Sequence, residues 1–261
     1  MKHSSKLVLS AVALASAAFA QTSFAEESLA YNVGVISEYR YRGLGQTKGN
    51  PALQGGVDYD SGKGFYLGAW GSTIKWIAET GKQNSVADVK GPVELDLYGG
   101  YKFEAAGLGL DVGYLRYEYV GNTLDKASGA GYKNANTDEL YGAATYGPFT
   151  LKYSHAFSNL FGVDNSKGSE YWDLTANFDL GQGYTFTPHL GHQKVKNYAN
   201  YSYSDYALTL AKDLGDGLSV TLAAVGTNVP KSKADANFVY YNTNNYNPAK
   251  STLVVGLKYT F

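Results

Sequence analysis

A two-residue alternation of apolar and polar side chains recurs along nearly the whole chain and restricts its fold more than any other feature. In the closing stretch TLVVGLKYTF, one face carries leucine, valine and aromatic residues, whereas the other is mostly threonine, glycine and lysine. Successive side chains of a β-strand point to opposite sides, so this stretch predicts a two-faced strand. About twelve such stretches follow residue 30, each near the length of about ten residues that a tilted strand needs to cross a bilayer.

The connections between these stretches alternate in length. Short ones, rich in the glycine and proline that tight turns require, are predicted at residues 61–63, 104–107, 147–148, 181–183 and 214–217. Longer polar ones are predicted at residues 44–50, 75–92, 121–136, 158–168, 196–202 and 227–250. All short connections therefore lie at one end of the sheet, as in transmembrane barrels. An even strand number also brings the last strand beside the first, which removes the free edges.

Aromatic residues indicate which face is outward, since a soluble barrel shows the same alternation with its apolar face inward. Here the polar face carries glycines and acids that suit a wet interior, and aromatics collect near the short connections. We expect one membrane girdle from Tyr59, Phe65, Tyr101, Phe103, Phe149, Phe178, Tyr184, Phe186, Tyr259 and Phe261, and the start of the other from Tyr39, Tyr41, Tyr114 and Tyr153. The predicted fold is an all-β transmembrane antiparallel β-barrel of about 12 strands, with short periplasmic turns and long extracellular loops.

The N-terminal stretch MKHSSKLVLSAVALASAAFAQTSFA has a basic start, an apolar segment and small-x-small sites, which predicts a signal peptide at residues 1–25. Cleavage after Ala25 is preferred to cleavage after Ala20, and residues 26–261 are expected to form one barrel domain. Removal takes two lysines from 22 basic residues and leaves 20 against 23 acidic ones, a net charge of −3. This balance argues against nucleic acid as a partner. The absence of cysteine excludes a disulfide framework.

The stretch NVGVISEYRYRGLGQT resembles the N-terminal pattern of TorF-type porins of proteobacteria, roughly N-V-G-x-x-S-x-Y-x-x-R-G-x-S-Q-T, with Gly45 at the usual serine position. The matching positions are Asn32, Val33, Gly34, Ser37, Tyr39, Arg42, Gly43, Gln46 and Thr47. The resemblance implies a channel in the bacterial outer membrane and leaves its solute undefined. The final strand, ending in Phe261, also resembles the signal that the barrel assembly machinery recognises, so this machinery and outer-membrane lipid are expected partners.

A passive channel for ions or small polar solutes is the leading functional prediction. Eight strands leave an interior that side chains fill and sixteen leave a wide channel, so about twelve predict a narrow pore. The candidate pore-lining residues are Glu38, Arg40, Arg42, Asp58, Glu94, Asp96, Lys102, Asp111, Lys152, Asp173, Asp205 and Lys258. Their slight excess of acids predicts a weak preference for cations. The alternative is that these charges pair across strands and fill the lumen, which gives a plugged structural barrel.

An outer-membrane hydrolase is a second hypothesis with little support. Ser154 and His155 are adjacent on a strand and point to opposite faces, and His189 and His192 are three apart, so neither pair forms a catalytic or metal site. Asp58 and Asp60 are too few for calcium. No catalytic residue, cofactor or metal is therefore predicted, and the chain is not expected to be an enzyme.

Adhesion through the extracellular loops is a third hypothesis. The connection at residues 227–250 is the longest and is rich in asparagine and tyrosine, a composition that suits binding of partners or sugars. The preferred interpretation is that this connection folds over the mouth of the barrel and constricts it.

Overall fold

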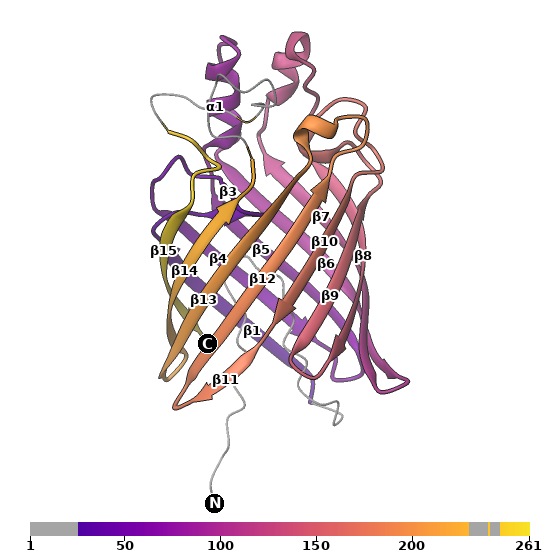
Figure 1. Cartoon of the computed structure of the whole chain (residues 1–261), viewed down its shortest axis with the longest axis vertical. Coiled ribbons are helices and arrows are strands. Elements are labelled where there is room, and N and C mark those ends of the chain that lie inside the picture. The colour runs from indigo at the N-terminus through magenta and orange to yellow at the C-terminus, as the bar shows by residue number, and fades with distance from the viewer. Residues whose placement is uncertain (1–25, 230–239, 241–245) are drawn as a thin grey trace, which may run out of the picture.

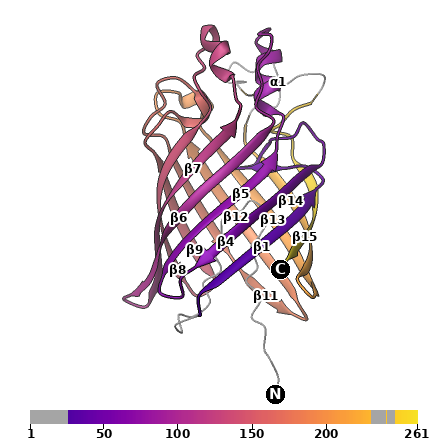
Figure 2. The same cartoon turned by 180° about the vertical axis from the view of Figure 1, so that it is seen from behind.

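The computed structural model describes residues 26–229, 240 and 246–261, which form a closed antiparallel β-barrel (Figures 1 and 2). The described wall consists of β1 (Ser28–Ile36), β4 (Ala52–Asp60), β5 (Phe65–Thr73), β6 (Val93–Ala105), β7 (Leu108–Val120), β8 (Thr137–Tyr146), β9 (Phe149–Ala156), β10 (Glu170–Ala176), β11 (Phe178–Gly181), β12 (Tyr184–Lys194), β13 (Tyr203–Gly215), β14 (Leu218–Thr227) and β15 (Thr252–Thr260). Both β10 and β11 pair with β12, so these thirteen segments make a twelve-stranded wall. The predicted barrel fold is confirmed; the predicted signal peptide lies outside the described residues.

Strand β15 pairs with β1 and closes the barrel, as the sequence predicts. The register places Val33 opposite Tyr259 and Val35 opposite Leu257. The pairing extends to the last residue, because the backbones of Tyr31 and Phe261 exchange two hydrogen bonds of 2.9 Å. The final strand is therefore no free edge.

The short connections all lie at one end, where β1 begins and β15 ends (Figure 1). The β6–β7 connection is a two-residue turn at Ala106 and Gly107, whose φ values are 53° and 77°. Two positive φ values define a type I′ turn, which matches the twist of paired strands and favours glycine at the second position. The remaining short turns occupy the predicted segments to within one or two residues.

The apolar face of the wall is outward. Leu208 and Val255 are 52% and 51% exposed, whereas Glu94 and Asp205 on the polar face are 1% and 3% exposed. Of the predicted girdle, seven residues are exposed, namely Phe65, Tyr101, Phe149, Phe178, Tyr184, Tyr259 and Phe261, and three are half-buried, namely Tyr59, Phe103 and Phe186. This orientation excludes, for the described strands, a soluble barrel with an apolar interior. The girdle's contact with membrane stays a prediction.

The first strand is shorter than the alternation predicts. The period continues through SEYRYRG, but β1 ends at Ile36 and the chain then turns inward. Tyr39 is only 1% exposed and Tyr41 is half-buried, so placing these two residues on an outer girdle is wrong. Strand β7, in contrast, keeps its register with β6 to Val120 without a bulge, and Arg116 on it faces outward.

The long connections carry the described helices and most of the buried apolar residues. Helix α1 (Trp76–Gln83) and the 3₁₀ helices η1 (Leu124–Ala130), η2 (Leu160–Gly162) and η3 (Ala199–Tyr201) lie at this end. The main apolar cluster consists of Ile36, Tyr39, Ala52, Ile74, Ile77, Val89, Tyr117, Tyr119, Leu124, Ala135 and Val254. None of the described helices is long and apolar enough to cross a membrane. The packed core thus lies at the long-connection end of the barrel.

Candidate functional site: the lumen and the hairpin that crosses it

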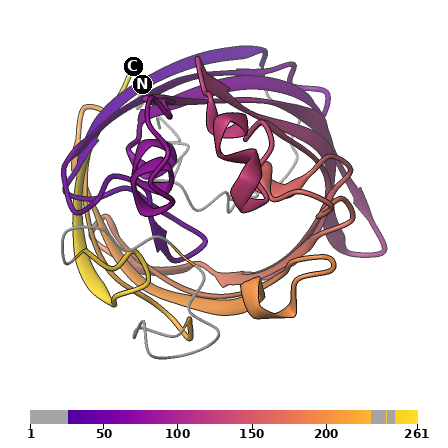
Figure 3. The same cartoon turned by 90° about the horizontal axis from the view of Figure 1, so that it is seen from above.

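A short hairpin from the first long connection enters the bore. It consists of β2 (Arg40–Tyr41) and β3 (Leu44–Gly45), joined by Arg42 and Gly43 with φ values of 45° and 77°. Viewed from the long-connection end, this segment lies inside the ring of wall strands (Figure 3). A Cβ atom on Gly43 would lie 2.5 Å from Cγ2 of Thr227 and 2.6 Å from Cβ of Asp205. The tip of the hairpin therefore touches the wall at β13 and β14.

Arg42 anchors the tip of the hairpin. Its Nη2 atom lies 3.0 and 2.7 Å from the two carboxylate oxygens of Glu139, and its Nη1 donates to Oε1 of Gln193 at 2.7 Å. The guanidinium also lies 4.2 Å from the ring centroid of Tyr171, and the hydroxyl of Tyr203 donates to the backbone oxygen of Arg42 at 2.9 Å. Side chains from four wall strands thus hold one arginine.

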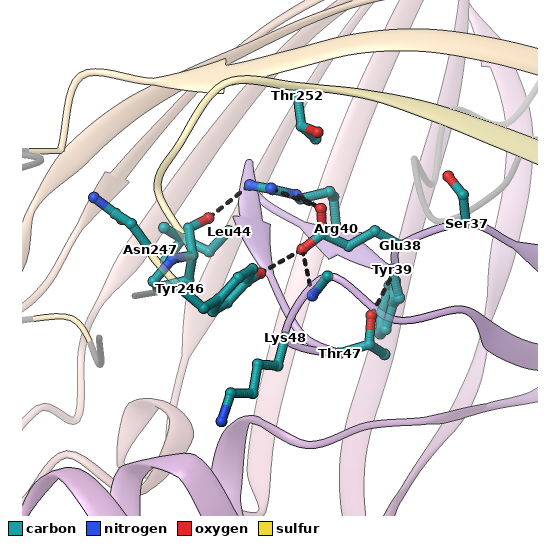
Figure 4. Close-up of polar contacts among 12 residues, drawn as sticks. Ser37, Glu38, Tyr39, Arg40, Leu44, Thr47, Lys48, Tyr246, Asn247 and Thr252 are labelled. Carbon is teal, nitrogen blue, oxygen red and sulfur yellow. Dashed lines mark hydrogen bonds and ion pairs between the residues drawn. The ribbon is translucent and has the colours of Figure 1, made fainter. Parts of the chain in front are cut away.

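Glu38 and Arg40 join the hairpin to the last long connection (Figure 4). Arg40 pairs with Oε2 of Glu38 at 2.8 Å and donates from Nη1 to the backbone oxygen of Pro248 at 2.6 Å. The other carboxylate oxygen of Glu38 accepts hydrogen bonds from the Gly49 amide at 3.0 Å and from the hydroxyl of Tyr246. The described end of the last connection therefore contacts the hairpin at the mouth. Constriction of the mouth by residues 227–250 stays a prediction, because residues 230–239 and 241–245 lie outside the described residues.

Tyr39 fixes the base of the hairpin to β6. Its hydroxyl donates to Oε1 of Glu94 at 2.9 Å. Burial, followed by the nearby charges of Glu94 and Asp96, raises the pKa of Tyr39 well above its usual value. The hydroxyl therefore keeps its proton and remains a donor.

The wall beyond the hairpin carries charges of both signs. One row of directly opposed positions runs across β6 to β13 through Lys102, Asp111, Ala143, Lys152, Asp173, Gly191 and Asp205. His189 bridges the last two acidic residues of this row: its Nδ1 lies 3.2 Å from Asp173 and its Nε2 lies 2.8 Å from Asp205. Such a row presents ionic and hydrogen-bonding groups to the interior, which suits water or a polar solute.

Inward tyrosines accompany these charges, and sequence reasoning gave them no role. The hydroxyl of Tyr66 donates to Asp111 at 2.7 Å and also contacts the hydroxyl of Tyr141. The ammonium groups of Lys102 and Lys152 lie 4.7 and 4.0 Å from the ring centroids of Tyr66 and Tyr141. The alternation itself indicates their direction, because these tyrosines occupy the same alternate positions as the polar residues that face the lumen.

The twelve predicted pore-lining residues are buried or half-buried, and none lies on the exposed wall. They form two groups. Glu38, Arg40 and Arg42 belong to the hairpin, whereas Asp58, Glu94, Asp96, Lys102, Asp111, Lys152, Asp173, Asp205 and Lys258 belong to wall strands. Their role in conduction stays a prediction.

The histidines are separated as their spacing predicts. His189 faces the lumen, whereas His192 is exposed outside and contacts Ser204 at 3.0 Å. Within the described residues, no group of three or more His, Cys, Asp or Glu side chains could hold a metal ion. Nor do the contacts of His189 in the described part of the chain include a serine.

Two solved porins share the fold at very low sequence identity. The structure described as "NanC porin structure in rhombohedral crystal form" has a TM-score of 0.53 and 12% identity, covering 90% of this chain and 99% of that one. The structure described as "KdgM porin in complex with disordered oligogalacturonate" has a TM-score of 0.52 and 8% identity, covering 89% and 98%. No curated protein matches the sequence. The model of one family, described as "Bacterial protein of unknown function (Gcw_chp)", matches residues 20–261, and the chain therefore belongs to that family.

Proposed function

We propose that this protein is an outer-membrane channel through which ions or small polar solutes diffuse passively. One observation carries the proposal: the strands turn leucine, valine and aromatic side chains outward and bury acidic side chains such as Glu94, Asp111 and Asp205 in the lumen. Such a wall is stable where hydrocarbon surrounds it. Closure of the barrel gives every strand a hydrogen-bonding neighbour, which the backbone needs because lipid offers no hydrogen bonds. The resemblance to TorF-type porins, the predicted signal peptide at residues 1–25 and assembly through the C-terminal strand fit the same location.

The proposed channel is narrow for two reasons. A barrel of twelve strands is wider than one of eight, whose side chains fill it, and narrower than one of sixteen. The hairpin at residues 37–51 then occupies part of this bore through its contacts at Arg42 and Gly43. The bore that remains is lined by charges of both signs, and the excess of acids predicts a weak cation preference.

Planar bilayer recording of the purified, refolded full chain tests this proposal. We expect discrete current steps and, under a KCl gradient, a small reversal potential of the sign that marks cation preference. Silent bilayers, together with correct refolding shown by heat-dependent gel migration, would mean that the barrel is plugged. Labelling with a photoactivated lipid-soluble probe tests the membrane orientation separately, because Leu208 and Val255 should react while Thr209 should not.

A further inference from the structure

A partly open cavity of about 110 Å³ lies among the long connections at the mouth of the barrel. Each of the six long connections contributes one aromatic ring to its lining, namely Tyr41, Trp76, Tyr132, Phe161, Tyr201 and Tyr240. These rings come from segments up to 199 positions apart in the sequence. Six unrelated loops that each bring one ring to a common cavity form a built site.

Ring-to-ring contacts hold much of this lining in place. On one side, Trp76 packs edge-on against Tyr119 at 5.3 Å, and Phe161 packs edge-on against Tyr41 at 5.7 Å. On the other side, Tyr240 lies 5.9 Å from Tyr201. Edge-to-face packing is the preferred geometry of aromatic pairs and keeps their positions fixed. The cavity is therefore preformed, which lowers the entropic cost of binding a ligand.

The lining is uncharged, in contrast to the lumen beyond the hairpin. The described lining residues include no Asp, Glu, Lys, Arg or His. Polar groups come from Gln46, Thr80, Gln193 and tyrosine hydroxyls. The indole Nε1 of Trp76 is buried and has no hydrogen-bond partner among the described residues. A buried donor without a partner is costly, and a ligand oxygen would satisfy it.

We propose that this cavity binds a neutral sugar ring, an inference that rests on the proposed channel function because it names the solute class. A sugar has flat C–H faces that pack on aromatic rings, and hydroxyls that both donate and accept hydrogen bonds. An ion would lose its hydration without gaining a countercharge here. The site lies against Tyr41 and Leu44 of the hairpin, so a bound ring stands where the solute enters the bore.

Calorimetric titration of the detergent-solubilised full chain tests the site. The probes are methyl glucoside, its charged relatives glucuronate and glucosamine, and phenol as a ring without several hydroxyls. We expect the neutral sugar to bind at least about tenfold more tightly than either charged sugar, since desolvating an unpaired charge exceeds 1.4 kcal/mol. Equal or tighter binding of a charged sugar, or binding of phenol alone, overturns the proposal.

Variants locate the binding. Trp76→Leu should weaken methyl glucoside binding about tenfold, whereas the matched Trp172→Leu, on the outer wall at 45% exposure, should leave it unchanged. If Trp76→Leu fails to refold, Tyr132→Leu in another connection makes the same test. Conductance without sugar binding overturns this inference and leaves the channel standing. Sugar binding without conductance overturns the channel and leaves the site.

Discussion

Arg42, at the tip of the hairpin, forms an ion pair of 2.7 Å with Glu139 on β8. In the sheet order, β5, β6 and β7 separate β8 from β4, the wall strand into which the hairpin leads. The pair therefore connects the hairpin to a strand four positions away around the twelve-stranded wall. Both side chains are at most 5% exposed, so water does little to weaken their attraction.

Arg42→Ala should release the hairpin from the wall at β8. Removing one partner of a buried ion pair costs about 3–5 kcal/mol, because the remaining carboxylate is left buried without a countercharge. That cost is enough to shift the hairpin from docked to undocked by more than about a hundredfold. We expect a larger single-channel conductance, with Glu139→Gln changing it in the same direction.

Arg116→Ala is the matched control for this prediction. Arg116 also forms two ion pairs, with Glu118 and Asp138, but it lies on the outer face and is 35% exposed. Exposed pairs contribute only about 0.2–1 kcal/mol. The single-channel conductance of the Arg116→Ala variant should therefore equal that of the unmodified protein. If Arg42→Ala also leaves conductance unchanged, the hairpin does not limit the current.

Gly43→Ala tests whether the hairpin tip is docked against the wall, by adding a methyl group rather than by removing a charge. The added Cβ would come within 2.6 Å of two wall side chains, so the tip must move away from β13 and β14. Gly107 has the same φ of 77° and nothing within 4 Å of its Cβ position. Both substitutions carry the same backbone strain of about 1–2 kcal/mol, but only Gly43→Ala should raise conductance. Thermal unfolding measures the shared strain, and equal conductance in the two variants would argue against a docked tip.

Period-two alternation was enough to predict the wall, its short turns and its closure, because side-chain direction in a strand follows directly from parity. Parity cannot tell a wall strand from an inner hairpin. Residues 38–42 alternate in step with β1, so parity alone predicts that Tyr39 and Tyr41 face lipid. The physical reason that they turn inward is tertiary: the hydroxyl of Tyr39 donates to Glu94 on β6 and that of Tyr41 contacts the hydroxyl of Tyr117 on β7, while the neighbouring Arg42 pairs with Glu139 on β8.

The aromatic cavity lay beyond sequence reasoning for a similar reason. Single aromatics such as Trp76, Tyr132 and Phe161 occur in separate polar connections, and no spacing relates them. Their convergence depends on loop conformations, which strand periodicity does not encode. Only the richness of residues 227–250 in tyrosine hinted at a binding surface, and part of that segment lies outside the described residues.

Single charges near the short-turn end should set ion selectivity. Lys258 faces the lumen from β15, and its Nζ has no hydrogen-bond partner in the described part of the chain. A unit charge acts on a passing ion at 4 Å with about 1 kcal/mol in water. Lys258→Gln should therefore raise the cation-to-anion permeability ratio by up to about fivefold, and Asp58→Asn should lower it. Reversal potentials under a KCl gradient measure this ratio. The variant Lys63→Gln, in an exposed turn, should leave this ratio unchanged. If Lys63→Gln changes the ratio as much as Lys258→Gln does, residues outside the lumen set the selectivity.

Phe261 makes the last closing contacts of the barrel, and its backbone and ring can be tested apart. Deleting Phe261 removes both 2.9 Å backbone hydrogen bonds with Tyr31 and the ring stacked on Tyr31 at 5.8 Å, whereas Phe261→Ala removes only the ring. Two backbone hydrogen bonds contribute about 1–3 kcal/mol. Thermal unfolding in detergent should therefore rank the unmodified chain above Phe261→Ala, and Phe261→Ala above the deletion. Equal losses in the two variants would mean that the ring, rather than the completed strand pairing, stabilises the closure.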